Sequence, residues 1–371
     1  MKHLVLYHAR CNDGYMAAAA FSAAAARGAP HDVEYRPIAY TRYETLEAFK
    51  EFLGDIDDVD YIWFLDTCPT LMILDYLITL QGPEIIIVDH HLSALVNLTQ
   101  FHDTHPAPFL SGKIRTVFAT ERSGASLTVL LFRSRTINNI VKMRCTELWK
   151  EMDETQEKVL LVSNTLDSDA INDILYGELN DFDELVEVRD LWIQSDPATK
   201  ARADALSSYL AFHNVYEIPP QDFARWWVEQ GSLTHVVEKG FLIDAVGRAS
   251  AEDALRDTRY ELIETAKGPV HFYLGNCPSK LGSVFGEAGY MKHPDEQTIV
   301  VGLHVNYAKD GITLSIRSRN IKALPLAVAL GGGGHPNACG ARIDAAEQDV
   351  KFTTLFATVR DTLIKALEGG V

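Results

Sequence analysis

Short apolar segments that end on carboxylate or imidazole side chains recur along the first quarter of the chain. The segments are rich in β-branched and aromatic residues, which is typical of strands buried on both faces of a parallel sheet. They are residues 3–7, 61–65 and 85–88. The side chains that follow them are His8, Asp66 and the run Asp89-His90-His91. Because ligands bind at the carboxyl ends of parallel strands, we expect a functional site at this edge of the sheet.

The segments between these strands favour helices and one further strand. An alanine-rich helix is predicted at 15–27, a strand at 32–38, and helices at 43–53 and 70–80. This alternation predicts a parallel sheet with helices on its faces. Residues 92–114 are expected to be loop-like because of two prolines, and a helix with Ser123 as its N-cap is expected to reach Phe132.

The rest of the chain divides into two further parts. Acidic, helical spacing over 147–190 completes a first domain at 1–197, and residues 198–266 are predicted to be a helical connector. Residues 267–371 restart an α/β pattern and form a smaller C-terminal domain. Its strands are predicted at 270–274, 298–304 and 311–317, and its helices at 281–288 and 324–330.

Composition restricts the location of the protein. The chain has 371 residues, of which 47% are hydrophobic, and no apolar run approaches the ~18 residues of a membrane span. The first residues lead straight into a strand-like segment, so we expect no signal peptide, no membrane association and a cytoplasmic protein. Five scattered cysteines without a CxxC pair argue against a disulfide framework or a zinc ribbon.

Charge restricts the partners. The net charge of −17 disfavours long nucleic acid, because that affinity comes from neutralising phosphates. Residues 267–371 are near neutral, with 11 Lys and Arg against 9 Asp and Glu. We therefore expect an acidic region that can hold cations, followed by a region that can hold an anion.

The strand-end residues favour metal chemistry. Carboxylates and imidazoles suit Mn²⁺ or Mg²⁺ better than a structural zinc, and converging carboxylates repel each other unless a cation neutralises them. Two divalent ions can hold both the attacking and the leaving oxygen of a phosphate, which points to phosphoryl chemistry. Successive side chains of an extended segment point to opposite sides, so we expect His90 and His91 not to share one ion. Single Asp or His residues at strand ends are also common turn formers.

A glycine run near the C-terminus has a different chemistry. Residues 331–334 are all glycine and precede His335. Without Cβ atoms, the backbone can approach a phosphate and direct N–H groups at it. A glycine run alone also resembles a flexible linker.

Taken together, these motifs resemble the DHH phosphoesterase family of the DHH/DHHA1 type. The resemblance is carried by Asp89-His90-His91, by His8 with Asp13-Gly14, by Asp66 and by the distal glycine run. That family includes RecJ-type exonucleases, nanoRNases, cyclic-dinucleotide phosphodiesterases and type II inorganic pyrophosphatases. The resemblance implies an α/β fold with a parallel-sheet DHH domain and a DHHA1-like substrate-binding domain, and it allows a homodimer.

The resemblance also implies a role for each matching residue. His8, Asp66 and one neighbouring ligand would hold one Mn²⁺ or Mg²⁺ ion. Asp13, Asp66, His90 and a later aspartate would hold a second, so Asp66 would bridge the two. Asp190 is the chosen later aspartate, with Asp167 and Asp169 as rivals. Asp89 would support the histidines or bind weakly to metal, and His91 would face the scissile phosphate. In the second domain, the residues expected to bind substrate are Arg317, Arg319, Gly332, Gly333, Gly334 and His335.

Cys11 departs from the family pattern. Many members have two aspartates separated by one residue here, and the first of these positions is Cys11. Cysteine is a poor ligand for Mn²⁺ or Mg²⁺. Either Asn12 or water substitutes, or only one metal binds tightly, or Cys11 is a small buried residue without a ligand role.

Three functions are consistent with the sequence. The first is a phosphodiesterase in which metal-bound hydroxide cleaves short oligonucleotides or linear or cyclic dinucleotides to nucleoside 5′-monophosphates. Short substrates are favoured because a processive nuclease needs an extended basic groove. The second is a phosphomonoesterase or pyrophosphatase acting on nucleotides or polyphosphate, and the third is a non-catalytic nucleotide-binding module.

Overall fold

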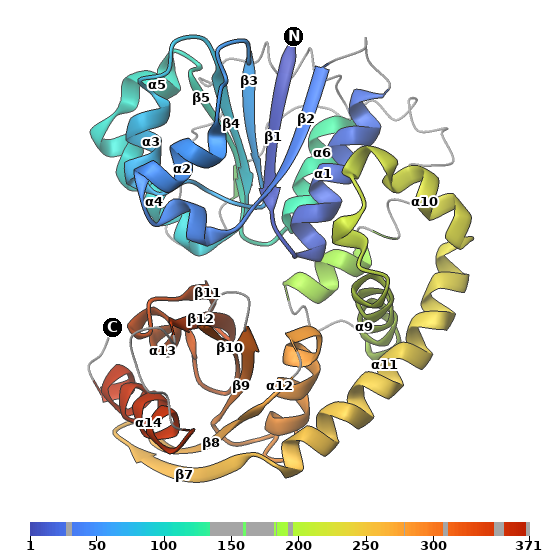
Figure 1. Cartoon of the computed structure of the whole chain (residues 1–371), viewed down its shortest axis with the longest axis vertical. Coiled ribbons are helices and arrows are strands. Elements are labelled where there is room, and N and C mark those ends of the chain that lie inside the picture. The colour runs from blue at the N-terminus through green and yellow to red at the C-terminus, as the bar shows by residue number, and fades with distance from the viewer. Residues whose placement is uncertain are drawn as a thin grey trace. The chain divides into compact units, whose positions relative to one another are not determined.

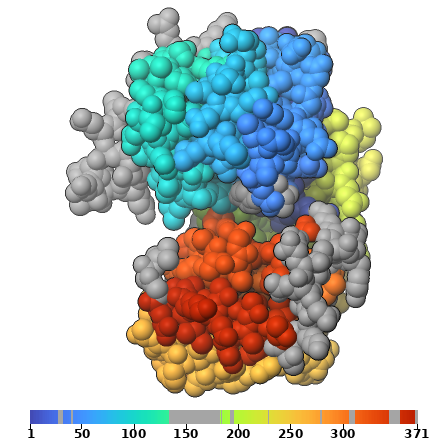
Figure 2. Space-filling model, turned by 60° about the vertical axis from the view of Figure 1, so that its left-hand side comes forward, coloured from blue at the N-terminus to red at the C-terminus, as the bar shows by residue number. Residues whose placement is uncertain are grey.

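The computed structural model describes residues 1–26, 32–133, 159–160, 182, 184–191, 196–277, 279–306, 311–344 and 352–368. The chain divides into two units, Met1–Leu242 and Ile243–Val371. A six-stranded sheet lies at the centre of each unit (Figure 1). Figure 2 shows the surface of the first unit in blue through teal to yellow and that of the second in orange to red.

The sheet of the first unit is parallel over its first five strands, which confirms the expected α/β fold. Its strands are β1 (Lys2–His8), β2 (Asp32–Ile38), β3 (Tyr61–Leu65), β4 (Glu84–Asp89), β5 (Ile114–Ala119) and β6 (Val159–Leu160). They are arranged in the order β2-β1-β3-β4-β5-β6, and only the short β6 is antiparallel to its neighbour. The chain reverses its direction across the sheet at β1, between β2 and β3. Such a switch point opens a crevice at the carboxyl ends of the strands.

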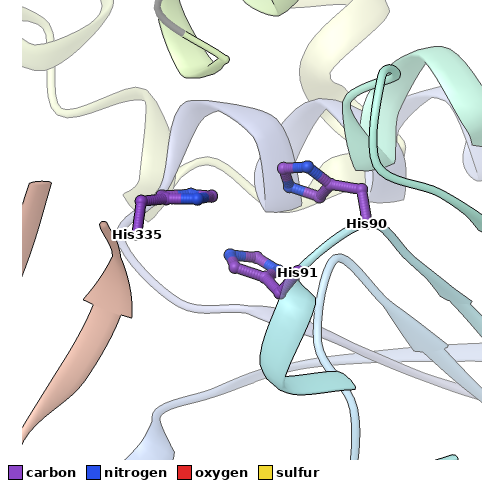
Figure 3. Close-up of side chains that lie close together, drawn as sticks. All are labelled: His90, His91 and His335. Atoms are coloured by element: carbon purple, nitrogen blue, oxygen red, sulfur yellow. The ribbon is translucent and has the colours of Figure 1, made fainter. Parts of the chain in front are cut away.

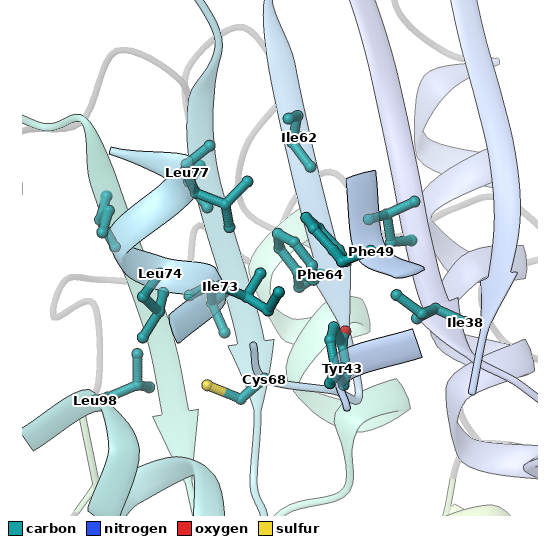
Figure 4. Packing of buried hydrophobic residues seen from close by; sticks show 14 of the residues in the cluster. Ile38, Tyr43, Phe49, Ile62, Phe64, Cys68, Ile73, Leu74, Leu77 and Leu98 are labelled. Atoms are coloured by element: carbon teal, nitrogen blue, oxygen red, sulfur yellow. The ribbon is translucent and has the colours of Figure 1, made fainter. Parts of the chain in front are cut away.

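Helices cover both faces of this sheet (Figure 1). On one face lie α1 (Asn12–Ala25) and α6 (Gly124–Arg133). On the other lie the 3₁₀ turn η1 (Tyr40–Tyr43), α2 (Leu46–Leu53), α3 (Leu71–Leu77), α4 (Leu92–Thr104) and α5 (Pro106–Leu110). Ala17 to Ala20 of α1 are buried, because side chains this small let the helix pack closely. The opposite face packs Phe64 and Ile62 of β3 against Phe49, Ile73 and Leu77 of the helices (Figure 4).

The predicted connector is helical, but it is not a separate part. It contains α9 (Pro197–Phe212), η4 (Val215–Glu217), η5 (Pro220–Asp222), α10 (Phe223–Gln230) and α11 (Leu233–Arg256). Residues up to Leu242 group with the first unit. None of the helices in the described part of the chain combines the length and apolar character that a membrane span requires.

The second unit contains a mixed sheet. Its strands are β7 (Arg259–Thr265), β8 (Gly268–Asn276), β9 (Thr298–Asn306), β10 (Gly311–Arg319), β11 (Gly333–His335) and β12 (Ala338–Asp344). The order is β11-β12-β10-β9-β8-β7, and only β8 and β9 are parallel. The 3₁₀ turn η6 (Ser279–Leu281) leads into α12 (Gly282–Tyr290), which packs on one face. The helices α13 (Leu324–Ala329) and α14 (Phe352–Glu368) pack on the other.

The structure corrects two sequence predictions of secondary structure. Residues 92–114 are not loop-like: they form α4 and α5, and Pro106 occupies the start of α5, where proline is tolerated. Residues 259–265, which were assigned to the connector, form the edge strand β7. Most of the side chains of β7 are exposed or half-buried, so the segment lacks the apolar run that marks a central strand.

Candidate metal centre

Three neighbouring strands of the first unit bring their terminal polar side chains together. His8 is the last residue of β1, Asp66 follows β3, and His90 follows β4. Asp13 joins them from the first turn of α1, and Asp190 joins them from helical residues 184–190. All five residues matched to metal ligands in the sequence analysis therefore lie in one cluster.

Asp66 is at the centre of this cluster. Its Oδ2 lies 3.2 Å from His8 Nδ1, and its Oδ1 lies 3.1 Å from His90 Nε2. The two oxygens thus face two different groups of side chains. Asp66 has a φ of 56°, a left-handed conformation that few residues other than glycine, asparagine and aspartate adopt. The strand end is therefore strained in a way that directs this carboxylate toward both groups.

His90 is surrounded by carboxylates. Besides Asp66, its Nε2 lies 3.3 Å from Asp190 Oδ2 and 3.4 Å from Asp13 Oδ2. The Asp190 Oδ2 atom is buried, and apart from its ion-pair contact with His90 it has no hydrogen-bond donor among the described residues. A buried carboxylate oxygen without a donor is costly unless a cation compensates it. This donor set therefore fits a divalent cation.

Burial and neighbouring charges shift the pKa values of the three carboxyl groups. Burial raises the pKa of Asp13 well above its ordinary value, and the charges of Asp66 and Asp190 add to this. Burial likewise raises the pKa of Asp190. Burial alone would also raise the pKa of Asp66, but hydrogen bonds from His8 and His90 outweigh it and lower the pKa well below the ordinary value.

The carboxylates around His90 shift the pKa of its ring. Burial lowers its pKa, but the hydrogen bond to Asp66 and the charges of Asp66, Asp190 and Asp13 outweigh burial and raise the pKa to about 10. Binding of a metal ion at this ring requires the loss of its proton.

Asp89 fixes the position of His91. Its Oδ1 accepts hydrogen bonds from the backbone N–H groups of His90 and His91, at 2.7 and 3.2 Å, and from His91 Nδ1 at 2.7 Å. Burial lowers the pKa of His91, but Asp89 outweighs it and raises the pKa overall. A protonated Nδ1 bound to Asp89 leaves Nε2 as the ring nitrogen available to another group.

The sequence analysis expected His90 and His91 to point to opposite sides, but they do not. Their ring centroids are 4.4 Å apart (Figure 3). The strand β4 ends at Asp89, and His91 is the N-cap of α4. The alternation of an extended segment therefore does not continue through these two residues.

The start of α6 holds the Asp13 carboxylate. The backbone N–H of Gly124 donates to Asp13 Oδ2 at 2.6 Å, and that of Ala125 donates to Oδ1 at 2.7 Å. Ser123 caps the helix as predicted, since its Oγ accepts from the N–H of Ser126 at 3.2 Å. The N–H groups of a helix start stabilise a carboxylate. These backbone donors were missed because no side-chain motif marks them.

Glu187 was also missed. Its Oε2 accepts from the N–H of Ser123 at 3.2 Å, and its Oε1 lies 3.3 Å from Arg122 Nη1. Residues three apart share one face of a helix, so this contact holds Asp190 on the side of the cluster. The sequence spacing of Glu187 and Asp190 could have indicated the pair.

Replacement of Gly124 by alanine should weaken the metal site. An added Cβ would lie 2.7 Å from Asp66 Cβ and 3.0 Å from Asp66 Cα, so α6 or Asp66 must move. We expect a stability loss of about 1–3 kcal/mol and a loss of Mn²⁺ affinity of about tenfold or more, measured by thermal melting and calorimetric titration.

Gly247→Ala in α11 is the matched control. There the added Cβ meets only Leu281 Cδ2, at 3.4 Å, and the Mn²⁺ affinity should not change. An unchanged Mn²⁺ affinity in Gly124→Ala would show that close packing at Asp66 does not matter for the site.

The structure also bears on the departure at Cys11. Asn12 does not substitute as a ligand, because its Nδ2 donates to Ser207 Oγ at 2.9 Å and its Oδ1 accepts from Tyr216 Oη at 2.5 Å. The Cys11 thiol lies beside His8 and Asp66. Burial raises the pKa of this thiol well above its ordinary value, and the charge of Asp66 adds to this. The rival ligands Asp167 and Asp169 lie outside the described residues.

Within the second unit, Ala338 of β12 pairs with Arg317 of β10 on one side and with His335 of β11 on the other. Residues directly opposite in an antiparallel sheet point to the same face. Arg319 shares this face by strand periodicity, and its guanidinium lies 5.7 Å from the Tyr290 ring centroid. The sheet thus gathers the three candidate substrate-binding side chains.

The glycine run has a packing role. Gly333 and Gly334 pair with Gly340 and Cys339 across a tight hairpin. A Cβ at Gly332 would meet Gly340 O at 2.0 Å, and Gly334 has a φ of 130°. These two glycines are therefore required by the backbone itself, whereas Gly333 has open space around it.

Comparisons with known proteins give fold-level similarities only. No protein-family model matches the chain, and no curated protein matches it in sequence. The solved structure of exonuclease RecJ bound to manganese aligns with 98% of this chain and 89% of its own, at 15% identity and a TM-score of 0.47.

Two further solved structures are similar at a lower level. An exopolyphosphatase-related protein from Bacteroides fragilis aligns over 98% of this chain and 92% of its own, at 12% identity and a TM-score of 0.40. The pGpG-specific phosphodiesterase PggH from Vibrio cholerae aligns over 98% and 100%, at 10% identity and a TM-score of 0.35. At these TM-scores the similarities carry no inference about activity.

Proposed function

We propose that this protein is a metal-dependent phosphoester hydrolase, with phosphodiesters in short nucleotides as its substrates. One observation carries the proposal. His8, Asp13, Asp66, His90 and Asp190 are gathered in a buried cluster at the switch point of a parallel sheet, with Asp66 contacting two groups of ligands. Buried carboxylates in this arrangement require cations.

Each residue of the cluster has a role in this proposal. Asp66 would help to hold cations on both of its sides, because its two oxygens face His8 and His90 separately. Divalent cations held there, Mn²⁺ or Mg²⁺, would activate water and neutralise charge on the phosphate. His91, oriented by its hydrogen bond to Asp89, would face the scissile phosphate as a general acid–base group.

The choice of short substrates depends on charge. The net charge of −17 opposes binding of long polyanions. We assign substrate binding to two cationic side chains, Arg317 and Arg319, and to His335 on the same face of the second sheet, which is enough for a substrate with few phosphates. Arg317 is oriented by its hydrogen bond to Ser283 Oγ at 2.9 Å.

A panel of phosphorylated compounds tests the proposal. The full chain with Mn²⁺ should cleave cyclic dinucleotides or di- to pentanucleotides and release nucleoside 5′-monophosphates, identified by chromatography. Release of phosphate from monoesters, polyphosphate or pyrophosphate without cleavage of diesters would decide for the phosphomonoesterase or pyrophosphatase alternative. Tight nucleotide binding without turnover would decide for the non-catalytic module.

A further inference from the structure

Cys11 contributes a sulfur atom to one side of the metal centre. His8, Cys11 and Asp66 each offer one ligand atom, and these three atoms lie within 4.8 Å of one another. The residue is the N-cap of α1, but its side chain makes no capping hydrogen bond. The helix start is formed instead by its backbone carbonyl, which accepts from the N–H of Tyr15 at 3.0 Å. The thiol is therefore not required by the helix.

The geometry of these three side chains suits a metal ion that accepts sulfur. Zinc bonds of about 2.3 Å to sulfur, 2.0–2.1 Å to nitrogen and 2.0–2.2 Å to oxygen place tetrahedral ligand atoms roughly 3.3–3.6 Å apart. The ligand atoms of His8, Cys11 and Asp66 lie within 4.8 Å of one another, so a modest inward movement of the side chains brings them to these distances. Three protein ligands leave a fourth position open, as in catalytic zinc sites.

The other side of Asp66 has a different donor set. Asp13, His90 and Asp190 also form a group within 4.8 Å, and it offers oxygen and nitrogen without sulfur. Oxygen-rich positions suit Mn²⁺ and Mg²⁺, whereas a thiolate favours Zn²⁺ and Co²⁺. Asp66 thus lies between two unlike positions.

We propose that His8, Cys11 and Asp66 form a thiolate-containing position that selects a borderline cation such as Zn²⁺ or Co²⁺, beside an oxygen-rich position for Mn²⁺ or Mg²⁺. This inference rests on the proposed function in that it concerns the same metal centre. It makes the enzyme a mixed-metal hydrolase, and it assigns to Cys11 the ligand role that an aspartate fills in the family pattern.

Co²⁺ absorption tests this inference independently of activity. Titration of the metal-free full chain with Co²⁺ should produce a thiolate-to-cobalt charge-transfer band in the near ultraviolet. The band should disappear in Cys11→Asp and persist in Cys277→Ala, which removes a buried thiol of the second unit. Circular dichroism and thermal melting establish that each variant is folded.

Competition between cations supplies the second measurement. Most sites with these ligand types bind Co²⁺ more tightly than Mn²⁺, so the informative quantity is the change in the affinity ratio between wild type and Cys11→Asp. Mutating a residue that only hydrogen-bonds to a metal ligand already lowers metal affinity by about 10- to 100-fold. We therefore expect the ratio of Co²⁺ to Mn²⁺ affinity to fall by about tenfold or more in Cys11→Asp. An unchanged ratio would overturn the proposal.

Alkylation of the wild-type protein covers the case in which Cys11→Asp fails to fold. Zn²⁺ should protect Cys11 from iodoacetamide, as seen by peptide mass spectrometry, and Mg²⁺ should not. Bound Co²⁺ without a charge-transfer band, or Zn²⁺ without protection, would overturn the inference. Hydrolysis assays on the same samples separate the two proposals. A band without hydrolysis contradicts only the proposed function, and hydrolysis without a band contradicts only the role of Cys11.

Discussion

Replacement of Asp66 by asparagine should abolish phosphoester hydrolysis while leaving the first unit folded. Asparagine keeps the shape of the side chain and tolerates the left-handed backbone at φ 56°, whereas alanine would add strain. It removes the charge that faces both His8 and His90. Since a catalytic cation contributes several kcal/mol and 1.36 kcal/mol is tenfold in rate, we expect kcat to fall by about 10³-fold or more.

The control for this variant is Asp58→Asn in the same unit. Asp58 is 73% exposed and pairs with Lys2 at 2.9 Å, so its loss should change stability by at most about 1 kcal/mol and leave hydrolysis unchanged. Steady-state kinetics with circular dichroism would measure both effects. Retention of more than a tenth of the wild-type kcat by a folded Asp66→Asn protein would remove Asp66 from the centre of the mechanism.

Removal of divalent cations should stop hydrolysis and lower the melting temperature. A ligand present at 100 times its dissociation constant stabilises the folded state by about 2.7 kcal/mol. For a unit of this size, that corresponds to a shift of roughly 5–10 °C. Thermal melting with EDTA and with excess divalent cation measures the shift, and the removed cations added back should restore both stability and activity.

The Mn²⁺ affinity should rise with pH. The His90 pKa of about 10 means that the metal-free ring is protonated at neutral pH, and each bound ion at this ring displaces that proton. One displaced proton makes the apparent affinity rise by about tenfold per pH unit below the pKa. Calorimetric titrations in buffers of different ionisation enthalpy count the released proton.

The stability of the metal-free protein should fall as the pH rises, whereas its Mn²⁺ affinity should increase. A raised His90 pKa stabilises the fold fully below its ordinary value of 6.5, and this contribution is lost as the pH rises through about 10. The stabilising effect of Mn²⁺ should therefore increase with pH. An affinity independent of pH over this range would show that His90 is not a ligand.

The parallel sheet and the strand-end positions of the cluster could be predicted because both depend on local pattern. Buried strands such as β3 and β4 are nearly uninterrupted apolar runs, and their ends are marked by Asp66 and Asp89. The segment 92–114 was mistaken for a loop because Pro106 and Pro108 are read as breakers, although Pro106 only starts a new helix.

Contacts made by the backbone could not be predicted in this way. The N–H groups of Gly124 and Ala125 reach Asp13 across more than a hundred residues of sequence. No residue type encodes such a contact, because every non-proline residue carries the same donor. The proximity of His90 and His91 was missed for a related reason, since it depends on where β4 ends.

The central claim is that the cluster around Asp66 binds divalent cations, and calorimetric titration of the metal-free full chain with Mn²⁺ tests it most directly. We predict saturable binding to the wild-type protein and binding at least about 100-fold weaker to Asp66→Asn. Heats of dilution alone for the wild type, or equal affinities for the two proteins, would contradict the claim.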